Sequence, residues 1–481
     1  MTATTVIRKL DWAAIWDPER ASHRYARQID LAWQGNSLVH VGPDYDGPAD
    51  EEIDGRGLFA LPGLVDVHSH PASEPLDKGF NEELGSPRLG MSGLYEYMPV
   101  MRADPEGTAA CAEVAYSELL LSGVTTLVDL SLAWDGWLDL FARSGLRGVL
   151  APMYRSARWY TPNGHRVDYD WDEKAGLAGL EDAVRLIERA RQHESGRMGG
   201  MLSPAQIDTC SEDLLRRSIA TAREKDWPIQ IHASQSVVEF NEMTRRHGVT
   251  PLQWLDSVDF LEERTTIAHC IFIDDHSWVR WHTQDDLALL AERDVGVAHC
   301  PNVFVRRGIL LESFGRYREA GLRIGLGTDT YPHNFLDEMR WACALGRVAE
   351  EHVETAHTGD ILHAATVGGA AVLRRDDIGR LATGCKADLV LVDLEHPAMK
   401  PGRDPLRALV WSAQDRAVRH VYVDGVQVVR DSRVLTLDRE DASARLHEAQ
   451  VRAMERAPDL DWAKRPMQQI SPLSLPLEDT P

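Results

Sequence analysis

The chain lacks several features that define other protein classes. It has six cysteines in 481 residues, too few for a disulfide framework, so we expect reduced thiols. No run approaches the roughly 20 apolar residues of a membrane span, and residues 1–16 lack a signal-peptide core. Lys and Arg total 52 against 75 Asp and Glu, which disfavours nucleic acid because phosphate binding needs clustered basic residues. These absences predict a cytoplasmic protein with no membrane or nucleic-acid partner.

What is present is a regular alternation of short apolar runs and amphipathic stretches. Eight runs have the length and composition of buried strands, at 65–67, 125–130, 147–153, 197–202, 228–233, 265–270, 295–300 and 323–329. Amphipathic stretches at 106–122, 177–191, 212–225 and 285–293 separate several of them. Eight strands separated by helices predict an α/β fold of the (β/α)₈ barrel type. A doubly wound open sheet is the alternative, although no GxGxxG or P-loop opens a helix to support a nucleotide-binding version.

Both ends of the chain carry β-like segments outside this alternation. Residues 4–10, 28–33 and 37–42 precede the first barrel strand, and 387–394 and 418–431 follow the last. The Asp424-Gly425 pair in the last segment is a strong hairpin signal. We therefore expect the two ends to pair into one small satellite domain.

Residues suited to metal or proton chemistry stand at the ends of five predicted strands. In LPGLVDVHSH (61–70), His68 and His70 are one residue apart at a strand end, so both side chains face the same side and can bind one metal ion. Barrel active sites are built at the carboxyl ends of the strands. The other residues at such ends are His232, His269, His299 and Asp329.

The ordered motifs PGLVDVHSH, IHASQ, AHC, AHCPN and GTD, followed by HAATVGGAAVL and IGRLATGCKADLVLVDL, resemble the amidohydrolase superfamily. The resemblance is nearest to the branch of cytosine and guanine deaminases, triazine hydrolases and phenylurea or thiocarbamate hydrolases. It implies a distorted (β/α)₈ barrel, often in a homo-oligomer, with a small β-sandwich made from both chain ends. The predicted boundaries are 1–60 for the first part of the sandwich, 61–380 for the barrel, 381–435 for the second part, and 436–481 for a C-terminal helix and tail.

The resemblance also implies roles for the residues at the strand ends. It assigns His68, His70, His232 and Asp329 as metal ligands, and His269 as the residue that polarises substrate or orients water. Because no lysine or glutamate in the third or fourth strand exit matches the bridging ligand of binuclear relatives, we expect one divalent ion. Zn²⁺ is the first choice, with Fe²⁺, Mn²⁺ and Co²⁺ as alternatives. Such an ion lowers the pKa of bound water towards about 7, and Asp329 would act as general base and then acid.

Three departures from the branch's pattern concern substrate recognition. Gln235 stands where deaminases carry a glutamic acid, and an amide cannot supply a proton at neutral pH. Ala205 replaces a histidine before the fifth strand, and the seventh-strand motif continues as NVFVRRG. We therefore predict attack by metal-bound hydroxide on an amide, urea or (thio)carbamate carbon of a small-molecule substrate. The alternatives are a hydrolytic deaminase or dechlorinase of a nitrogen heterocycle, and a non-catalytic small-molecule binding barrel.

The residues that line the substrate pocket are predicted with more alternatives than the metal ligands. Gln235 and His299 are candidate substrate contacts, and Trp159 is placed to stack on a flat substrate, although local packing explains a loop tryptophan equally well. Arg155, Arg306 and Arg307 could bind a carboxylate, but a solvated charge is the default expectation for each.

Overall fold

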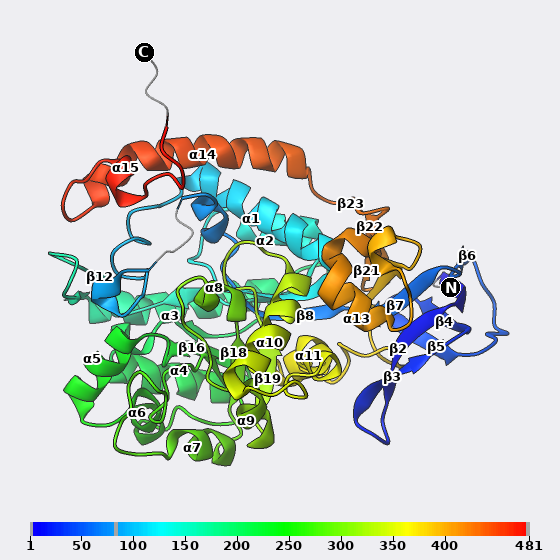
Figure 1. Cartoon of the computed structure of the whole chain (residues 1–481), viewed down its shortest axis with the longest axis horizontal. Helices are drawn as coiled ribbons and strands as arrows, with labels where there is room; N and C mark the ends of the chain where they lie inside the picture. Colours follow the sequence, from blue (N-terminus) through cyan, green and yellow to red (C-terminus); the bar gives the residue numbers. More distant parts are fainter. Residues whose placement is uncertain (1–2, 81–84, 478–481) are drawn as a thin grey trace.

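The core of the computed structural model, which describes residues 3–80 and 85–477, is a set of eight short parallel strands with helices between them (Figure 1). The strands form two four-stranded sheets, ordered β14-β10-β9-β8 and β16-β17-β18-β19. Their bounds are Leu64–Ser69 (β8), Val124–Asp129 (β9), Arg147–Leu150 (β10), Met198–Gly200 (β14), Ile229–Ala233 (β16), Thr265–His269 (β17), Gly296–His299 (β18) and Arg323–Leu326 (β19). Each lies within or beside a run predicted from the sequence, and the α/β class is as predicted.

Backbone hydrogen bonds connect the two sheets at both pairs of edges. Beyond β8 and β19, the His70 N–H donates to the Asp329 carbonyl at 2.9 Å, and the Asp329 N–H donates to the His68 carbonyl at 2.8 Å. Beyond β14, the Leu202 carbonyl accepts from the Gln230 N–H at 2.9 Å. The first of these connections holds the ends of β8 and β19 side by side.

Helices separate successive strands along the chain. They are α1 (Pro105–Leu121), α2 (Trp137–Ser144), α3 (Glu173–Arg191), α4 (Glu212–Lys225), α5 (Val237–His247), α6 (Pro251–Ser257), α7 (Asp286–Glu292), α8 (Pro301–Val305), α9 (Phe314–Glu319) and α10 (Phe335–Glu350), with α11 (Thr358–His363) and α12 (Gly369–Val372) after them. The first turns are capped by side chains. Asp104 accepts from Gly107 N, Asp172 from Ala175 N and Ser211 from Leu214 N. Such caps satisfy backbone donors that no helical carbonyl can reach, which fixes where these helices begin.

Two further sheets lie beside the strand–helix core, at the end where Figure 1 places the N-terminus. One is ordered β5-β4-β1-β6 and the other β23-β22-β21-β20-β7-β2-β3. Early and late segments meet in the second, because β20 (Leu389–Asp393) pairs antiparallel with β7 (Leu58–Pro62). The remaining bounds are Thr4–Leu10 (β1), Trp12–Asp17 (β2), Ser22–Ala26 (β3), Ile29–Gln34 (β4), Ser37–Gly42 (β5), Glu51–Asp54 (β6), Val418–Val423 (β21), Val426–Arg430 (β22) and Arg433–Val434 (β23).

These two sheets share a hydrophobic core that includes Ile7, Leu31, Trp33, Leu389 and Leu391. The predicted hairpin joins β21 and β22, and both residues of its Asp424-Gly425 turn have positive φ, 55° and 79°. A turn with both central residues in this conformation is the type that matches the twist of a hairpin.

The C-terminal helix α14 (Arg439–Leu460) lies along α1 (Figure 1). A Cβ on Gly107 would lie 2.8 Å from the Ala449 Cβ, so only glycine allows this close approach. Arg452 pairs with Asp104 at 2.7 Å across the same contact. The short helix α15 (Met467–Ile470) follows, and residues 1–2 and 478–481 of the predicted terminal segments lie outside the described residues.

Two expectations drawn from composition can be checked against the coordinates. All six cysteines are free thiols, as predicted, and all six are buried. Within residues 3–80 and 85–477, no helix has both the length and the apolar character that crossing a membrane requires.

Candidate metal centre

Three imidazoles lie close together at the strand ends. His68 lies at the end of β8 and His70 directly follows this strand, with ring centroids 5.0 Å apart, and His232 in β16 lies 4.8 Å from His68 and 5.4 Å from His70. Ser69, between the first two, instead contacts the Thr328 hydroxyl at 3.1 Å. The alternation of side chains along a strand produces this division.

Hydrogen bonds at Nδ1 fix the tautomer of each ring. The Nδ1 of His70 donates to the Leu130 carbonyl at 2.7 Å, and that of His232 donates to the Ala205 carbonyl at 2.5 Å. The Nδ1 of His68 contacts the Gln230 Oε1, and the Gln230 amide nitrogen donates to the Val67 carbonyl. Because the oxygens can only accept, each Nδ1 carries the proton and each Nε2 presents a lone pair.

The free atoms converge with the Asp329 carboxylate on one point. The Nε2 atoms of His70 and His232 are 3.3 Å apart, and Asp329 Oδ1 lies 3.4 Å from His70 Nε2 and 3.6 Å from His68 Nε2. Ligands bonded at about 2.0–2.1 Å around a tetrahedral zinc ion would be about 3.3 Å apart. The His68 Nε2 is buried and has no hydrogen-bond partner. The donor set therefore fits a metal ion, and the three histidines form one of the groups close enough to hold one.

Burial and mutual charge suit these residues to binding a cation. Burial and the neighbouring His68 lower the pKa of His70 to about 4, and burial with the other histidines lowers the pKa of His232 well below its usual value. Burial alone would raise the pKa of Asp329, but His269, His68 and His70 outweigh it and hold that pKa well below its usual value. At neutral pH His70 and His232 are therefore neutral imidazoles and Asp329 is a carboxylate, the protonation states that ligands require.

His269, at the end of β17, completes the cluster. Its Nε2 lies 3.8 Å from Asp329 Oδ2, its ring packs against Phe304 at 4.7 Å, and neither ring nitrogen has a hydrogen-bond partner. His68, His269 and Cys300 form a second group close enough to hold an ion. Burial and nearby carboxylates raise the pKa of Cys300 well above its usual value, which disfavours the thiolate that a metal would need.

The backbone is strained where it presents these groups. His269 and Asp329 have φ values of 76° and 57°, and Ser234 has 55°. Non-glycine residues seldom adopt this conformation, and such strain concentrates at functional sites. Close packing adds to it, because a Cβ on Gly327 would lie 2.7 Å from the Cβ and the carbonyl oxygen of His68. The sequence Gly327-Thr328-Asp329 therefore allows β19 to pass close to β8.

A cavity of 160 Å³ opens over the cluster. His70, His232 and Asp329 line it, as do two predicted substrate contacts, Gln235 and Trp159. The Gln235 Oε1 is buried without a partner, and Trp159 is held by a hydrogen bond from its Nε1 to Asp208 Oδ2 at 2.9 Å. Both side chains can therefore meet a molecule bound in the cavity.

His299 is placed differently. It lines a separate space of 10 Å³, together with His269, Phe304 and Phe314. Burial lowers its pKa to about 4. The structure thus brings Gln235 and Trp159 to the main cavity but places His299 in a separate space beside His269, and the contact of His299 with substrate stays a prediction.

Two charged residues of the cavity were not predicted from the sequence to be buried there. Glu74 lines it with its Oε2 buried and unpartnered. Arg307 also lines it and is 6% exposed, so the expectation of a solvated charge is wrong for this residue. The signals were weak, because Glu74 stands in a loop after His70 and Arg307 beside another arginine. Only the folded chain shows that both are buried.

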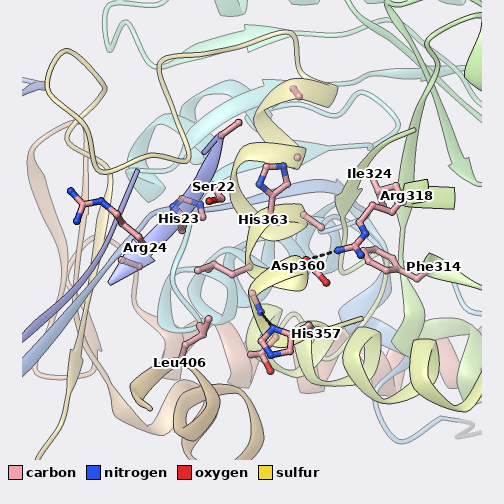
Figure 2. Close-up of a pocket in the computed structure, with 18 of the residues that line it drawn as sticks. Ser22, His23, Arg24, Phe314, Arg318, Ile324, His357, Asp360, His363 and Leu406 are labelled. Carbon is pink, nitrogen blue, oxygen red and sulfur yellow. Dashed lines mark hydrogen bonds and ion pairs between the residues drawn. The ribbon is translucent and has the colours of Figure 1, made fainter. Parts of the chain in front are cut away.

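A larger cavity of 600 Å³ lies near the other end of β19 (Figure 2). Ser22, His23 and Arg24 of β3, Arg318 of α9, and Asp360 and His363 of α11 contribute to its lining. Arg318 and Asp360 form an ion pair across part of it. It contains none of the site residues predicted from the sequence.

Comparison with known proteins places this geometry in a family. The model of the amidohydrolase family matches residues 59–428. The 5-methylthioadenosine/S-adenosylhomocysteine deaminase of Natronomonas pharaonis is 30% identical over 432 residues, covering 87% of this chain and 91% of the relative. The 5′-deoxyadenosine deaminase of Methanothermobacter thermautotrophicus is 30% identical over 405 residues, covering 82% and 87%.

Solved structures share the fold. An adenosine deaminase from Xanthomonas campestris with bound zinc superposes with a TM-score of 0.78 at 21% identity, covering 94% of this chain and 99% of that one. The atrazine chlorohydrolase of Arthrobacter aurescens, complexed with zinc, gives 0.76 at 21% identity, covering 93% and 100%. The chain therefore belongs to the amidohydrolase family, as the motifs at its strand ends predicted, and is a metal-dependent hydrolase of carbon–nitrogen bonds.

Proposed function

We propose that the eight parallel strands form a distorted (β/α)₈ barrel, and that the two flanking sheets form its β-sandwich. The hydrogen bonds between His70 and Asp329 and between Leu202 and Gln230 support closure, because they connect the two sheets at both pairs of edges. The shared core of the flanking sheets supports the sandwich. The boundaries 1–60, 61–380, 381–435 and 436–481, the homo-oligomer and the cytoplasmic location stay predictions.

We infer that His68, His70, His232 and Asp329 bind one divalent ion, with zinc as the first choice. The matched spacing of their free atoms and the zinc bound in two structural neighbours support this. When bound, such an ion supplies Lewis acidity and lowers the pKa of water towards about 7.

We propose hydrolytic deamination of an amino-substituted nitrogen heterocycle as the reaction. The observation that carries this proposal is the match, over more than four fifths of the chain, to deaminases of adenosine derivatives. This favours the alternative in our sequence analysis over its main prediction of an amide, urea or (thio)carbamate substrate. The three departures in the motifs indicated a changed substrate, but they did not justify a change of reaction class.

The residues of the cavity have separable tasks in this reaction. Asp329 accepts a proton from the attacking water at its carboxylate and passes it to the leaving amine. His269, neutral because burial lowers its pKa, stands beside Asp329 Oδ2 and stabilises charge that develops on the substrate. The Gln235 amide hydrogen-bonds the ring without protonating it. Trp159 forms a flat wall, fixed by Asp208 and by an edge contact with Tyr95 at 5.2 Å.

The direct test is ammonia release from a panel of aminated pyrimidines, purines and triazines by the metal-loaded protein. We expect turnover of at least one of them, with loss of ammonia equal to the hydroxylated product formed. Turnover of amides, ureas or carbamates with none of the heterocycles would restore our first prediction. Failure of every substrate with metal bound would instead support the non-catalytic binding barrel.

A further inference from the structure

The guanidinium group of Arg307 has no partner within the part of the chain that the structure describes. The residue is 6% exposed and lines the same cavity as Asp329. Asp329, Glu74 and Asp77 act on it only through space, because no carboxylate oxygen of the described residues lies within the 4.0 Å of an ion pair and none of their groups hydrogen-bonds its side chain. A buried charge left in this state is costly unless a ligand provides the counter-charge.

The neighbouring Arg306 differs from Arg307 because its guanidinium group has partners within the protein. It donates to the Thr330 hydroxyl at 2.7 Å and lies over the Tyr331 ring at 4.5 Å. The two arginines are adjacent in sequence, yet only the buried Arg307 has no side-chain partner among the residues that the structure describes. Packing alone therefore does not explain why a guanidinium group is held at position 307.

A second arginine contributes to the same cavity from another loop. Arg155 follows β11 (Met153–Tyr154), is half-buried, and has no hydrogen bond or ion pair among the described residues. The exposed Arg158 and Arg102 are near enough to repel it electrostatically. Arg155 and Arg307 therefore bring two positive charges to the lining of one cavity, which also contains the carboxyl groups of Glu74 and Asp329.

The size of the cavity limits what can occupy it. Its 160 Å³ is below the roughly 300–1,000 Å³ of most pockets for drug-sized ligands. It therefore suits a single-ring molecule better than a nucleoside.

We propose that the substrate is a small aminated heterocycle bearing a carboxylate, which Arg307 binds in a two-pronged contact and Arg155 supports. This rests on the proposed deaminase function for the amino group, but the carboxylate contact can be tested without any reaction. Guanidinium geometry matches a carboxylate in parallel hydrogen bonds, which gives both affinity and orientation. Binding the carboxylate at Arg307 fixes which ring atoms face Asp329 and Gln235.

The binding experiment uses ligands without an amino group, so that its outcome does not depend on deamination. Calorimetry compares pyrimidine-5-carboxylate with 5-methylpyrimidine on metal-loaded protein, Arg307→Met and the matched control Arg306→Met. We expect tenfold or greater preference for the carboxylate, lost in Arg307→Met with about 10- to 100-fold weaker binding, and retained in Arg306→Met. Equal affinity of the two ligands for the unaltered protein would overturn the proposal.

A carboxylate could also bind the metal directly, and the same variants separate that case. Binding that is unchanged in Arg307→Met and disappears on chelation would show a metal contact only and overturn the assignment.

Thermal unfolding without ligand gives a second measurement. Removing an unpaired buried charge should raise the midpoint by about 2–4 °C, whereas a fall would show that Arg307 is paired within the protein.

Ammonia release then tests the two proposals together. The pair is 4-aminopyrimidine-5-carboxylate and 4-amino-5-methylpyrimidine, and we expect faster release from the carboxylate. Selective carboxylate binding without ammonia release would refute the deaminase and leave the Arg307 contact in place. Ammonia release without any preference for the carboxylate would support the deaminase and refute the Arg307 contact.

Discussion

The cavities near the two ends of β19 differ in how their charged groups are satisfied. Near Arg323, the larger cavity has charges that neutralise one another, with Arg318 paired to Asp360 and Arg407 to Asp404 at 3.3 Å. Near Asp329, the smaller cavity contains Arg307, whose guanidinium group has no hydrogen-bond or ion-pair partner in residues 3–80 and 85–477. Buried polar groups are normally paired, and exceptions need an explanation. In this molecule the unsatisfied groups, and not the volume, mark the place where chemistry is expected.

Removing the metal should produce the largest difference between the two cavities. We expect chelation to reduce ammonia release to the uncatalysed background and zinc to restore it, because water without a bound metal ion keeps a pKa of about 15.7 and supplies little hydroxide at neutral pH. Metal analysis with a turnover assay checks this, and an unchanged circular dichroism spectrum excludes unfolding. Full activity in protein shown to be metal-free would remove the basis of the proposed mechanism.

The second-largest effect is the difference in turnover between variants that each lose one carboxylate, one in each cavity. Asp329→Asn should lower turnover by about 10⁴-fold, because the residue binds the ion and moves the proton. The matched Asp360→Asn change breaks only a partly exposed ion pair with Arg318, so turnover should stay within twofold and stability within about 1 kcal/mol. Steady-state rates and urea unfolding of both variants decide the point. Comparable losses of turnover would show that the larger cavity also takes part.

Gln235 gives a gain-of-function test within the smaller cavity. Gln235→Glu should raise deamination by about 10²-fold, because a carboxyl group can donate the proton that the amide withholds. Gln206→Glu, in the same cavity, provides the matched control and should bring no gain. Rapid deamination by the unaltered protein, with no gain in Gln235→Glu, would mean that another group such as Glu74 supplies the proton.

The smallest effect concerns the pH dependence of stability in the metal-free protein. Burial lowers the pKa of His299 to about 4, against about 6.5 in an unfolded chain. Between these values the unfolded chain binds more protons at this histidine than the folded protein does. The free energy of unfolding of the protein therefore falls as the pH drops from about 6.5 to 4. At pH 4 this histidine should cost about 3 kcal/mol. Urea unfolding of His299→Gln should show a correspondingly flatter profile; an identical profile would mean that His299 is not buried in the neutral form.

Local sequence patterns predicted the parallel strands of the core well and the lining of the pocket poorly. The run at 265–270 became β17 (Thr265–His269), and 323–329 became β19 (Arg323–Leu326), because short apolar segments between amphipathic helices have few alternatives to a buried parallel strand. The hairpin strands β12 (Ala157–Tyr160) and β13 (Asp168–Trp171), which present Trp159, were not predicted. Their pairing depends on tertiary contacts that no periodicity in the sequence encodes.

The substrate prediction shows a further limit. Gln235, Ala205 and the residues after His299 differ from the motif, and each difference is readable in the sequence. Their consequence depends on what else enters the cavity, and only the fold shows that Glu74 and Arg307 do. A substitution in a motif therefore indicates a changed site but does not by itself identify the new substrate.

By itself, the sequence determined the strand–helix order and the residues that would stand at the strand ends, because side-chain alternation and hydrophobic pattern are local properties. Only the tertiary structure decided that His68, His70, His232 and Asp329 present their free atoms to one point. That arrangement depends on hydrogen bonds from the histidines to oxygens of Leu130, Ala205 and Gln230 far along the chain. The tertiary structure also decided that Arg307 is buried, with no side-chain partner in the described part of the chain, because burial is a property of the packed molecule and not of any segment.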